Sequence, residues 1–167
     1  MIRRCLIAAL ALVIVIVVPA LAAVRKAPSR ASVTAVDRPA FEPNRYLGDG
    51  LRWARDETRI KSGGTLTLRN RTRETHNFSI VSRRQVPRTA RQVENCRICK
   101  SINDAHDLSA GPPKVAIVDK DGKGFNQPGD SAAFTSSLKL KVSAKPGRTL
   151  RFICAVHPWM QGKIVVR

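Results

Sequence analysis

The chain has 167 residues, of which 30 are Lys or Arg and 12 are Asp or Glu, and its formal net charge is +18. This length leaves room for one domain with a single substantial core. The charge concerns partners more than fold. With only three His in the chain, enzymes that hold several metal ions through many imidazole ligands are excluded.

Residues 1–24 have the pattern of an export segment. Arg3 and Arg4 precede a charge-free stretch from Cys5 to Val24, which contains the small-residue sequence Ala-Leu-Ala-Ala near its end. This order is typical of a signal peptide, with cleavage expected after residue 22 or 23. The alternative is an uncleaved membrane anchor over residues 5–24, because twenty residues can span a bilayer. Both interpretations predict an extracytoplasmic protein, either periplasmic or secreted.

Residues 25–40 carry Pro28 and Pro39 and are expected to be a linker, either a flexible tether or a loosely attached first strand. The folded domain is predicted over residues 41–167. Its first segment, 41–60, should enter the fold, with Trp53 a core or rim aromatic. Further on, apolar residues alternate with polar ones in several short runs, which are 65–70, 76–80, 138–142 and 150–154. Short alternating strands separated by Gly and Pro turns predict an all-β sandwich.

Residues 83–130 are predicted to be an insertion between strands of the sandwich, with one strand at 114–118 and a turn at 119–124. Its first part is strongly basic: six cations face only Glu94 between residues 83 and 100, and they are Arg83, Arg84, Arg88, Arg91, Arg97 and Lys100. We expect this stretch to be a docking surface for an acidic partner. A solvated basic loop is the alternative.

Cys96 and Cys99 lie in the same insertion, seven residues before His106. A local disulfide is the favoured interpretation, because an exported protein folds under oxidising conditions. A second metal site made of these two thiols and His106 is one alternative, although it lacks an obvious fourth ligand. A thiol-exchange motif is the other.

The most informative motif is Cys154-Ala-Val-His157-Pro-Trp-Met160, which places a thiol, an imidazole and a thioether three residues apart. A blue-copper site needs these ligands plus a second imidazole. His76 supplies that imidazole, since it shares its parity with the core residues of its strand. The alternative is a buried Cys and Met that pack as small hydrophobic residues beside a surface His.

These motifs resemble those of a cupredoxin of the plastocyanin, pseudoazurin and amicyanin type. The matching segments are 63–70, 76–78, 146–154 and the ligand loop with the strand that follows it, 154–166. The resemblance implies a Greek-key β-sandwich with the insertion between the first His ligand and the Cys ligand. It implies one type 1 copper, with His76, Cys154 and His157 as equatorial ligands and Met160 as the axial one.

The resemblance also assigns supporting roles. Asn77 would orient the ligand loops through hydrogen bonds near the Cys154 sulfur. Pro158 restricts the backbone of His157 to extended conformations. Trp159 is expected either at an apolar electron-exit patch around His157 or packed under the ligand loop.

The function expected from these features is one-electron transfer outside the cytoplasm, without enzymatic activity. The alternative is a protein that stores or delivers copper. A third class, a metal-free adhesion module on the same sandwich, would not need Cys154. The expected partner is an acidic redox protein, with an anionic membrane or cell-wall surface as a second possibility, and no nucleic acid is expected.

Overall fold

The computed structural model describes residues 26–44, 46–108 and 112–167. The strands are β1 (Arg30–Val36), β2 (Ala40–Glu42), β3 (Tyr46–Gly48), β4 (Arg52–Trp53), β5 (Glu57–Ile60), β6 (Thr65–Asn70), β7 (His76–Val81), β8 (Ile117–Val118), β9 (Ser131–Phe134), β10 (Ser137–Lys141), β11 (Thr149–Ile153) and β12 (Gln161–Val166). The helices are α1 (Ala90–Glu94) and α2 (Arg97–His106). The predicted segment 1–24 lies outside the described residues.

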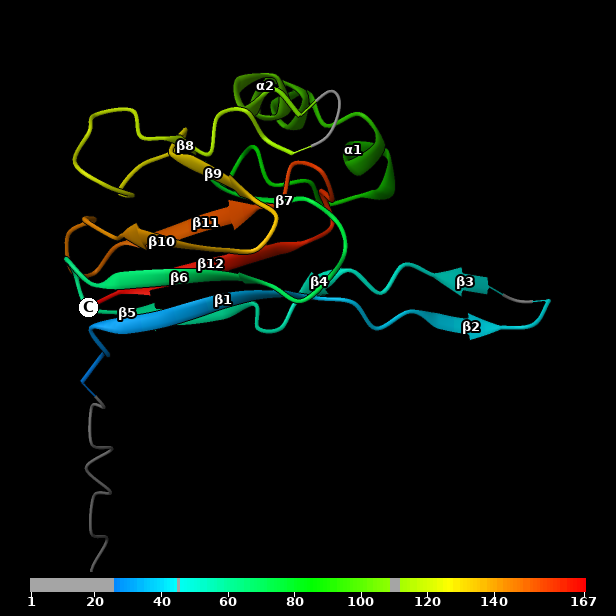
Figure 1. Cartoon of the computed structure of the whole chain (residues 1–167), viewed down its shortest axis with the longest axis horizontal. Coiled ribbons are helices and arrows are strands. Elements are labelled where there is room, and N and C mark those ends of the chain that lie inside the picture. The colour runs from blue at the N-terminus through cyan, green and yellow to red at the C-terminus, as the bar shows by residue number, and fades with distance from the viewer. Residues whose placement is uncertain (1–25, 45, 109–111) are drawn as a thin grey trace, which may run out of the picture.

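Two sheets face each other (Figure 1). One has the strand order β10-β6-β1-β4, and the other has the order β5-β12-β11-β7-β9-β8. Strand β1 runs parallel to β6, and β5 runs parallel to β12, whereas the other pairs in these two sheets are antiparallel. The predicted cupredoxin-like β-sandwich is therefore confirmed.

The core lies between the sheets because each strand turns alternate side chains inward. Leu66 and Leu68 of β6 are fully buried. Leu140 of the neighbouring β10 is almost completely buried. From the other sheet, the rings of Phe78 and Phe152 meet with their centroids 4.4 Å apart. The alternation seen in the sequence thus places these residues where the core needs them.

Of the two alternatives for residues 25–40, the structure agrees with a first strand over residues 30–36, although β1 lies in the middle of a sheet and is not loosely attached. It pairs with β6 on one side and β4 on the other, and Val33 and Ala35 are buried. Conversely, the strands β2 and β3 form a hairpin that projects from one end of the sandwich (Figure 1). Phe41 is 70% exposed there, so it does not enter the core, whereas Trp53 is buried.

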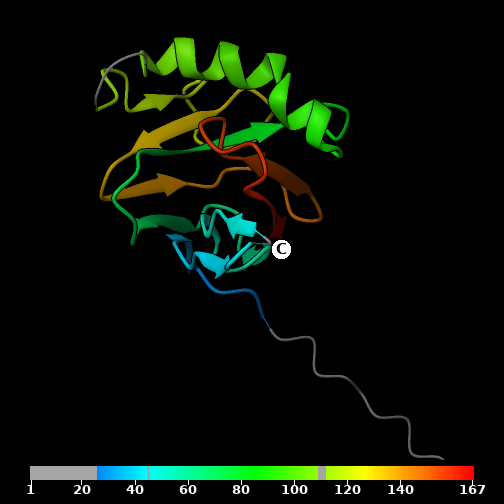
Figure 2. The ribbon, with the colours of Figure 1, turned by 90° about the vertical axis from the view of Figure 1, so that its right-hand side faces the viewer.

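The insertion contains two helices that were not predicted, and its predicted strand is reduced to β8. Figure 2 shows the helices stacked on one side of the sandwich. Cys99 and Ile102 of α2 pack against Val81 and Ile153 on the outer face of the six-stranded sheet. None of the helices in the described part of the chain is long and apolar enough to cross a membrane.

Cys96 and Cys99 form a disulfide at the start of α2. His106, at the end of the same helix, is buried, and its two ring nitrogens lie 2.5 Å from the Val115 carbonyl oxygen and 2.6 Å from Ser131 Oγ. Since both nitrogens have partners and both thiols are oxidised, the structure does not support a second metal site made of these three residues.

Candidate metal centre

Three donor side chains converge at one end of the sandwich. His76 opens strand β7, Cys154 follows the last residue of β11, and His157 lies three residues further on, in the turn that leads to β12. The Sγ atom of Cys154 lies 3.8 Å from Nδ1 of His76 and 3.7 Å from Nδ1 of His157. All three donor atoms fall within 4.8 Å of one another.

The backbone of the ligand loop closes on itself and so fixes the spacing of its side chains. The Cys154 N–H donates to the Met160 carbonyl oxygen at 2.9 Å, and the Met160 N–H donates to the His157 carbonyl oxygen at 2.8 Å. Pro158 adds a residue whose φ is fixed, and it disfavours helical conformations of His157. Met160 is 1% exposed and belongs to the same buried cluster as Cys154.

Asn77 joins the two segments that carry the donors. Its backbone N–H donates to Cys154 Sγ at 3.4 Å, and its side-chain Oδ1 accepts a hydrogen bond from the Ala155 N–H. Asn77 is completely buried. It therefore holds the Cys154 sulfur in place and ties the start of β7 to the ligand loop.

Two further residues support the centre, and no pattern in the sequence marked them. Thr72 Oγ1 lies 2.8 Å from Nε2 of His76, the ring nitrogen that points away from the sulfur. Because the Thr72 hydroxyl donates to Asn70 Oδ1, its oxygen can accept from Nε2–H, which favours the tautomer in which Nδ1 carries a free lone pair. Asn103, on α2 of the insertion, accepts from Asn77 Nδ2 at 3.1 Å and donates to the Ala155 carbonyl oxygen at 3.3 Å.

Burial sets the protonation of the donors. It raises the pKa of the Cys154 thiol from 9.0 to about 11, although nearby backbone N–H groups oppose the rise. Burial, followed by the neighbouring His157, lowers the pKa of His76 from 6.5 to about 4. Burial also lowers the pKa of His157. At neutral pH the imidazoles are therefore neutral and able to bind a metal, which must displace the proton of the thiol.

The donors fit a single copper ion. A first-row metal with bonds of about 2.0–2.3 Å to nitrogen and sulfur can bridge donor atoms separated by such distances. One thiolate and two imidazoles with a nearby thioether form the donor set typical of blue copper, in which the Met ligand is weak and axial. The group is also buried, which excludes competing water. The strand order and this donor set agree with what the resemblance to the cupredoxins implies, a sandwich with one copper site.

Trp159 lies between the centre and the solvent. Trp159 is 43% exposed, and its ring meets the ring of His157 edge-on, with centroids 5.3 Å apart. Its Nε1–H donates to the Leu51 carbonyl oxygen at 3.0 Å. Trp159 thus packs against the chain that precedes β4 and still presents an apolar face at the surface next to His157.

Comparisons with known proteins gave matches among solved structures alone, since no family model and no curated protein matches the chain. A dithionite-reduced auracyanin from Roseiflexus castenholzii is 17% identical, with 85% of this chain and 99% of that chain covered and a TM-score of 0.45. Auracyanin A from Chloroflexus aurantiacus is 22% identical, with coverages of 84% and 99% and a TM-score of 0.41.

A purple cupredoxin from Nitrosopumilus maritimus is 16% identical, with 82% of this chain and 99% of that chain covered and a TM-score of 0.41. These TM-scores all lie below 0.5. The assignment of the fold therefore rests on the strand order and on the arrangement of His76, Cys154, His157 and Met160.

Proposed function

We propose that this protein is a one-electron carrier outside the cytoplasm. The observation that carries the proposal is the buried group of one thiol and two imidazoles beside Met160, with the edge of His157 next to an exposed Trp159. Copper bound there would supply a one-electron couple between Cu(I) and Cu(II).

The residues around the centre favour rapid electron transfer because they hold the donors in one arrangement. Asn77 forms a hydrogen bond with the Cys154 sulfur, and Thr72 forms one with the outer nitrogen of His76. Within the ligand loop, the Cys154 N–H donates to the Met160 carbonyl oxygen. Donors that cannot move cannot rearrange when the charge changes. A site held in this way keeps the structural cost of gaining or losing an electron small.

Among the three donors, His157 is the one that reaches the surface. His76 and Cys154 are completely buried, whereas His157 is 8% exposed and touches Trp159. A partner that docks over Trp159 would come close to the imidazole edge of His157 while water stays excluded from the sulfur. We therefore assign the exit of the electron to this end of the sandwich.

The observations favour a carrier over an enzyme or a copper-delivery protein. Two of the three His in the chain belong to the centre, and both ring nitrogens of the third, His106, have partners in the fold. A second imidazole-rich copper site is therefore not available. Delivery requires easy release of the metal, which complete burial of His76 and Cys154 opposes.

The proposed location follows from two features. The sequence of residues 1–24 has the pattern of a signal peptide or anchor. The disulfide between Cys96 and Cys99 would persist in an oxidising compartment. An acidic redox protein is the proposed partner, attracted by the cations of residues 83–100, all of which are exposed.

Voltammetry of the copper-loaded protein, followed by a challenge with a Cu(I) chelator, tests this function. A carrier gives a reversible one-electron wave and retains its copper over many cycles. A wave that disappears within a few cycles, with the copper recovered in the chelator, would instead indicate storage or delivery.

A further inference from the structure

The outer face of the four-stranded sheet carries positive charge and no negative charge. Strands β10, β6, β1 and β4 contain no Asp or Glu at all. Five of their residues are exposed Lys or Arg: Arg30, Arg52, Arg69, Lys139 and Lys141. We call these five residues, with the hydroxyl side chains between them, the basic face.

The register of the strands spreads these cations over the sheet. Lys141 pairs with Thr65, which in turn lies beside Arg30, and Arg69 lies between Ser137 and Thr34. Cations and hydroxyl side chains are therefore interspersed across the outer face of the sheet. Such side chains donate hydrogen bonds, and charge-assisted bonds to phosphate are the strongest of this kind.

The cations of the basic face have no acidic partners in the part of the chain that the structure describes. The ion pairs found there all lie on the six-stranded sheet or in the insertion, as with Glu57, which binds Arg59 and Lys163. The nearest acids in the sequence, Asp37, Asp49 and Asp56, lie outside the ends of β1 and β4. The positive potential of the face is therefore not neutralised locally.

The two sheets also differ in what covers them. Helix α2 packs on the outer face of the six-stranded sheet through Cys99 and Ile102. Figure 1 looks onto the other sheet, and no helix lies in front of β1 and β6. The outward side chains of β1, β6 and β10 are exposed or half-buried.

We infer that the basic face binds the surface of a bilayer that contains anionic phospholipid. A protein partner would need an apolar anchor, usually an aromatic residue or a long aliphatic one, but Val36 is the only apolar side chain that points outward from β1, and it is half-buried. A flat array of cations and hydroxyls suits a layer of phosphate groups better. Clusters of Lys and Arg beside a membrane are attracted to anionic lipid.

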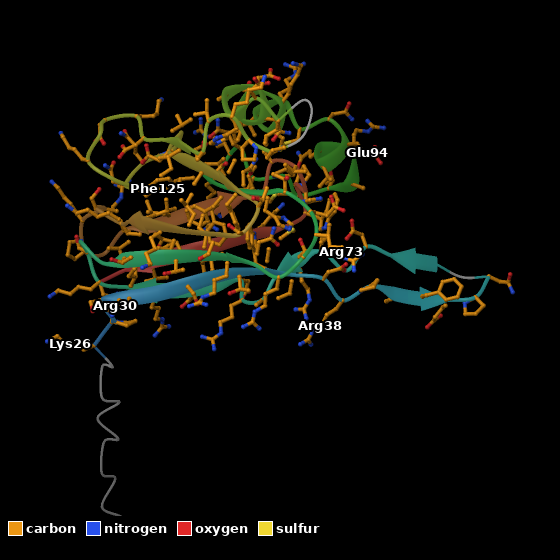
Figure 3. The ribbon with its side chains drawn as sticks, viewed as in Figure 1. Lys26, Arg30, Arg38, Arg73, Glu94 and Phe125 are labelled. Carbon is orange, nitrogen blue, oxygen red and sulfur yellow. A yellow bond between two sulfur atoms is a disulfide. The ribbon has the colours of Figure 1, made fainter. Side chains whose placement is uncertain are left out.

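The path of the chain supports the same partner. The described chain begins at Lys26, and Figure 3 places Lys26 next to Arg30 at one end of the basic face. The charge-free run ends at Val24, so only five residues separate it from Arg30. They can span at most about 20 Å. If the run stays in the membrane, this end of the face is held close to the lipid, and if it is removed, charge alone provides the attraction.

This arrangement leaves the copper centre accessible. The ligand loop lies at the end of the sandwich from which the hairpin of β2 and β3 projects (Figure 1). The basic face is the outer face of one sheet, whereas Trp159 lies at one end of the sandwich. When the basic face lies on a membrane, Trp159 is therefore directed along the membrane surface and not into it. The inference does not depend on the proposed function, because it rests on the charge and exposure of one sheet.

Lysine acetylation of the full chain, read by mass spectrometry, tests the inference. The chain is mixed with vesicles of phosphatidylcholine or of phosphatidylcholine and phosphatidylglycerol at a ratio of 7:3. We expect Lys139 and Lys141 to react about tenfold more slowly on the anionic vesicles, and 0.5 M salt should abolish the protection because it screens the attraction. Lys100 on α2 and Lys163 on the other sheet serve as internal controls and should react at unchanged rates.

A pair of matched variants separates the basic face from the rest of the charge. Changing the five cations of the face to Gln should lower the ratio of the partition coefficients on anionic and neutral vesicles by about 3,000-fold, since each cation contributes roughly fivefold. The ratio cancels any insertion of the N-terminal run. The control variant changes five exposed cations of the insertion to Gln, namely Arg83, Arg84, Arg88, Arg91 and Arg97.

Three results would overturn the inference. One is protection of Lys100, together with a loss of binding in the control variant, which would move the contact to the insertion. Another is equal reactivity of Lys139 on both kinds of vesicle. The last is protection of Lys139 by a soluble acidic protein or polymer but not by lipid, which would assign the face to that class of partner.

Discussion

Asn103 lies in the insertion, and replacing it by Ala should remove hydrogen bonds that support the metal centre. Asn103 accepts a hydrogen bond from Asn77 and donates one to the Ala155 carbonyl oxygen. Asn77 and Ala155 are 0% and 3% exposed, so both lose a partner that water replaces poorly. Each buried group left without a partner costs about 1–3 kcal/mol. Because Asn103 itself is at the edge of the fold, we take the lower end and expect a loss of about 2 kcal/mol in the free energy of unfolding.

Urea unfolding of the metal-free protein measures the loss of stability. The visible spectrum of the copper-loaded protein measures the effect on the metal centre. We expect Asn103→Ala to lose stability and also to shift the absorption band, since Asn77 donates to the Cys154 sulfur. Asn103→Asp keeps the acceptor for Asn77 but cannot donate to Ala155, so it should restore part of both effects.

Lys100→Ala is the matched control on the same helix. Lys100 is exposed and forms an ion pair with Asp104, which is worth at most about 0.5 kcal/mol. Among the described residues, Lys100 forms no hydrogen bond with the ligand loop. If Asn103→Ala and Lys100→Ala give the same stability and the same spectrum, the insertion does not support the centre and the reasoning fails.

Three further predictions concern the centre and the core. Thr72→Val should lower copper affinity about 10- to 100-fold, because the outer nitrogen of His76 loses its partner, while Thr72→Ser should bind nearly as well; competition with a chelator measures both. The free energy of unfolding of the metal-free protein should rise by up to about 3 kcal/mol between pH 4 and 6.5. The reason is that the pKa of His76 is lowered to about 4 in the folded protein, so the unfolded chain binds one more proton in this range and stability is lost as the pH falls. Burial shifts the pKa of His106 in the same direction, and an unfolding free energy that does not change with pH would contradict both shifts. Gly162→Ala should cost about 1–3 kcal/mol in thermal or urea unfolding, since its Cβ would meet the Phe152 ring at 2.5 Å, and an unchanged stability would show that the ring can move aside.

Much of the sandwich is predictable because large apolar residues alternate with polar ones. Leu66 and Leu68, or Leu138 and Leu140, stand out against their polar neighbours. Strand β1 is concealed by its composition: Ala31, Val33 and Ala35 alternate with Ser and Thr, which gives little contrast in hydrophobicity. Only its position between β6 and β4, a long-range feature, makes this segment a strand.

The two helices of the insertion differ in how far the sequence predicts them. Helix α1 has five residues and buries none of them, while α2 buries only Cys99, Ile102 and His106 among its ten. The three buried residues of α2 recur at the i, i+3, i+7 spacing of one helix face, so the sequence does carry a helical pattern there. Contact with Ile153 and Val81 then fixes where α2 lies on the sheet.

The metal donors are visible in the sequence because a ligand loop fixes the spacing of Cys154, His157 and Met160. The supporting residues are not. Thr72 and Asn103 are common polar residues, and Asn103 reaches a carbonyl oxygen 52 positions away. Such pairs depend on how the insertion packs on the sheet, which local spacing does not encode.

The central claim is that Cys154 provides the thiolate of a blue-copper centre, and the visible and EPR spectra of the Cu(II)-loaded protein test it most directly. The account predicts an intense thiolate-to-copper absorption band and a narrow copper hyperfine splitting, both lost in Cys154→Ser. A pale Cu(II) spectrum with ordinary hyperfine splitting, the same in the protein and in Cys154→Ser, would contradict it.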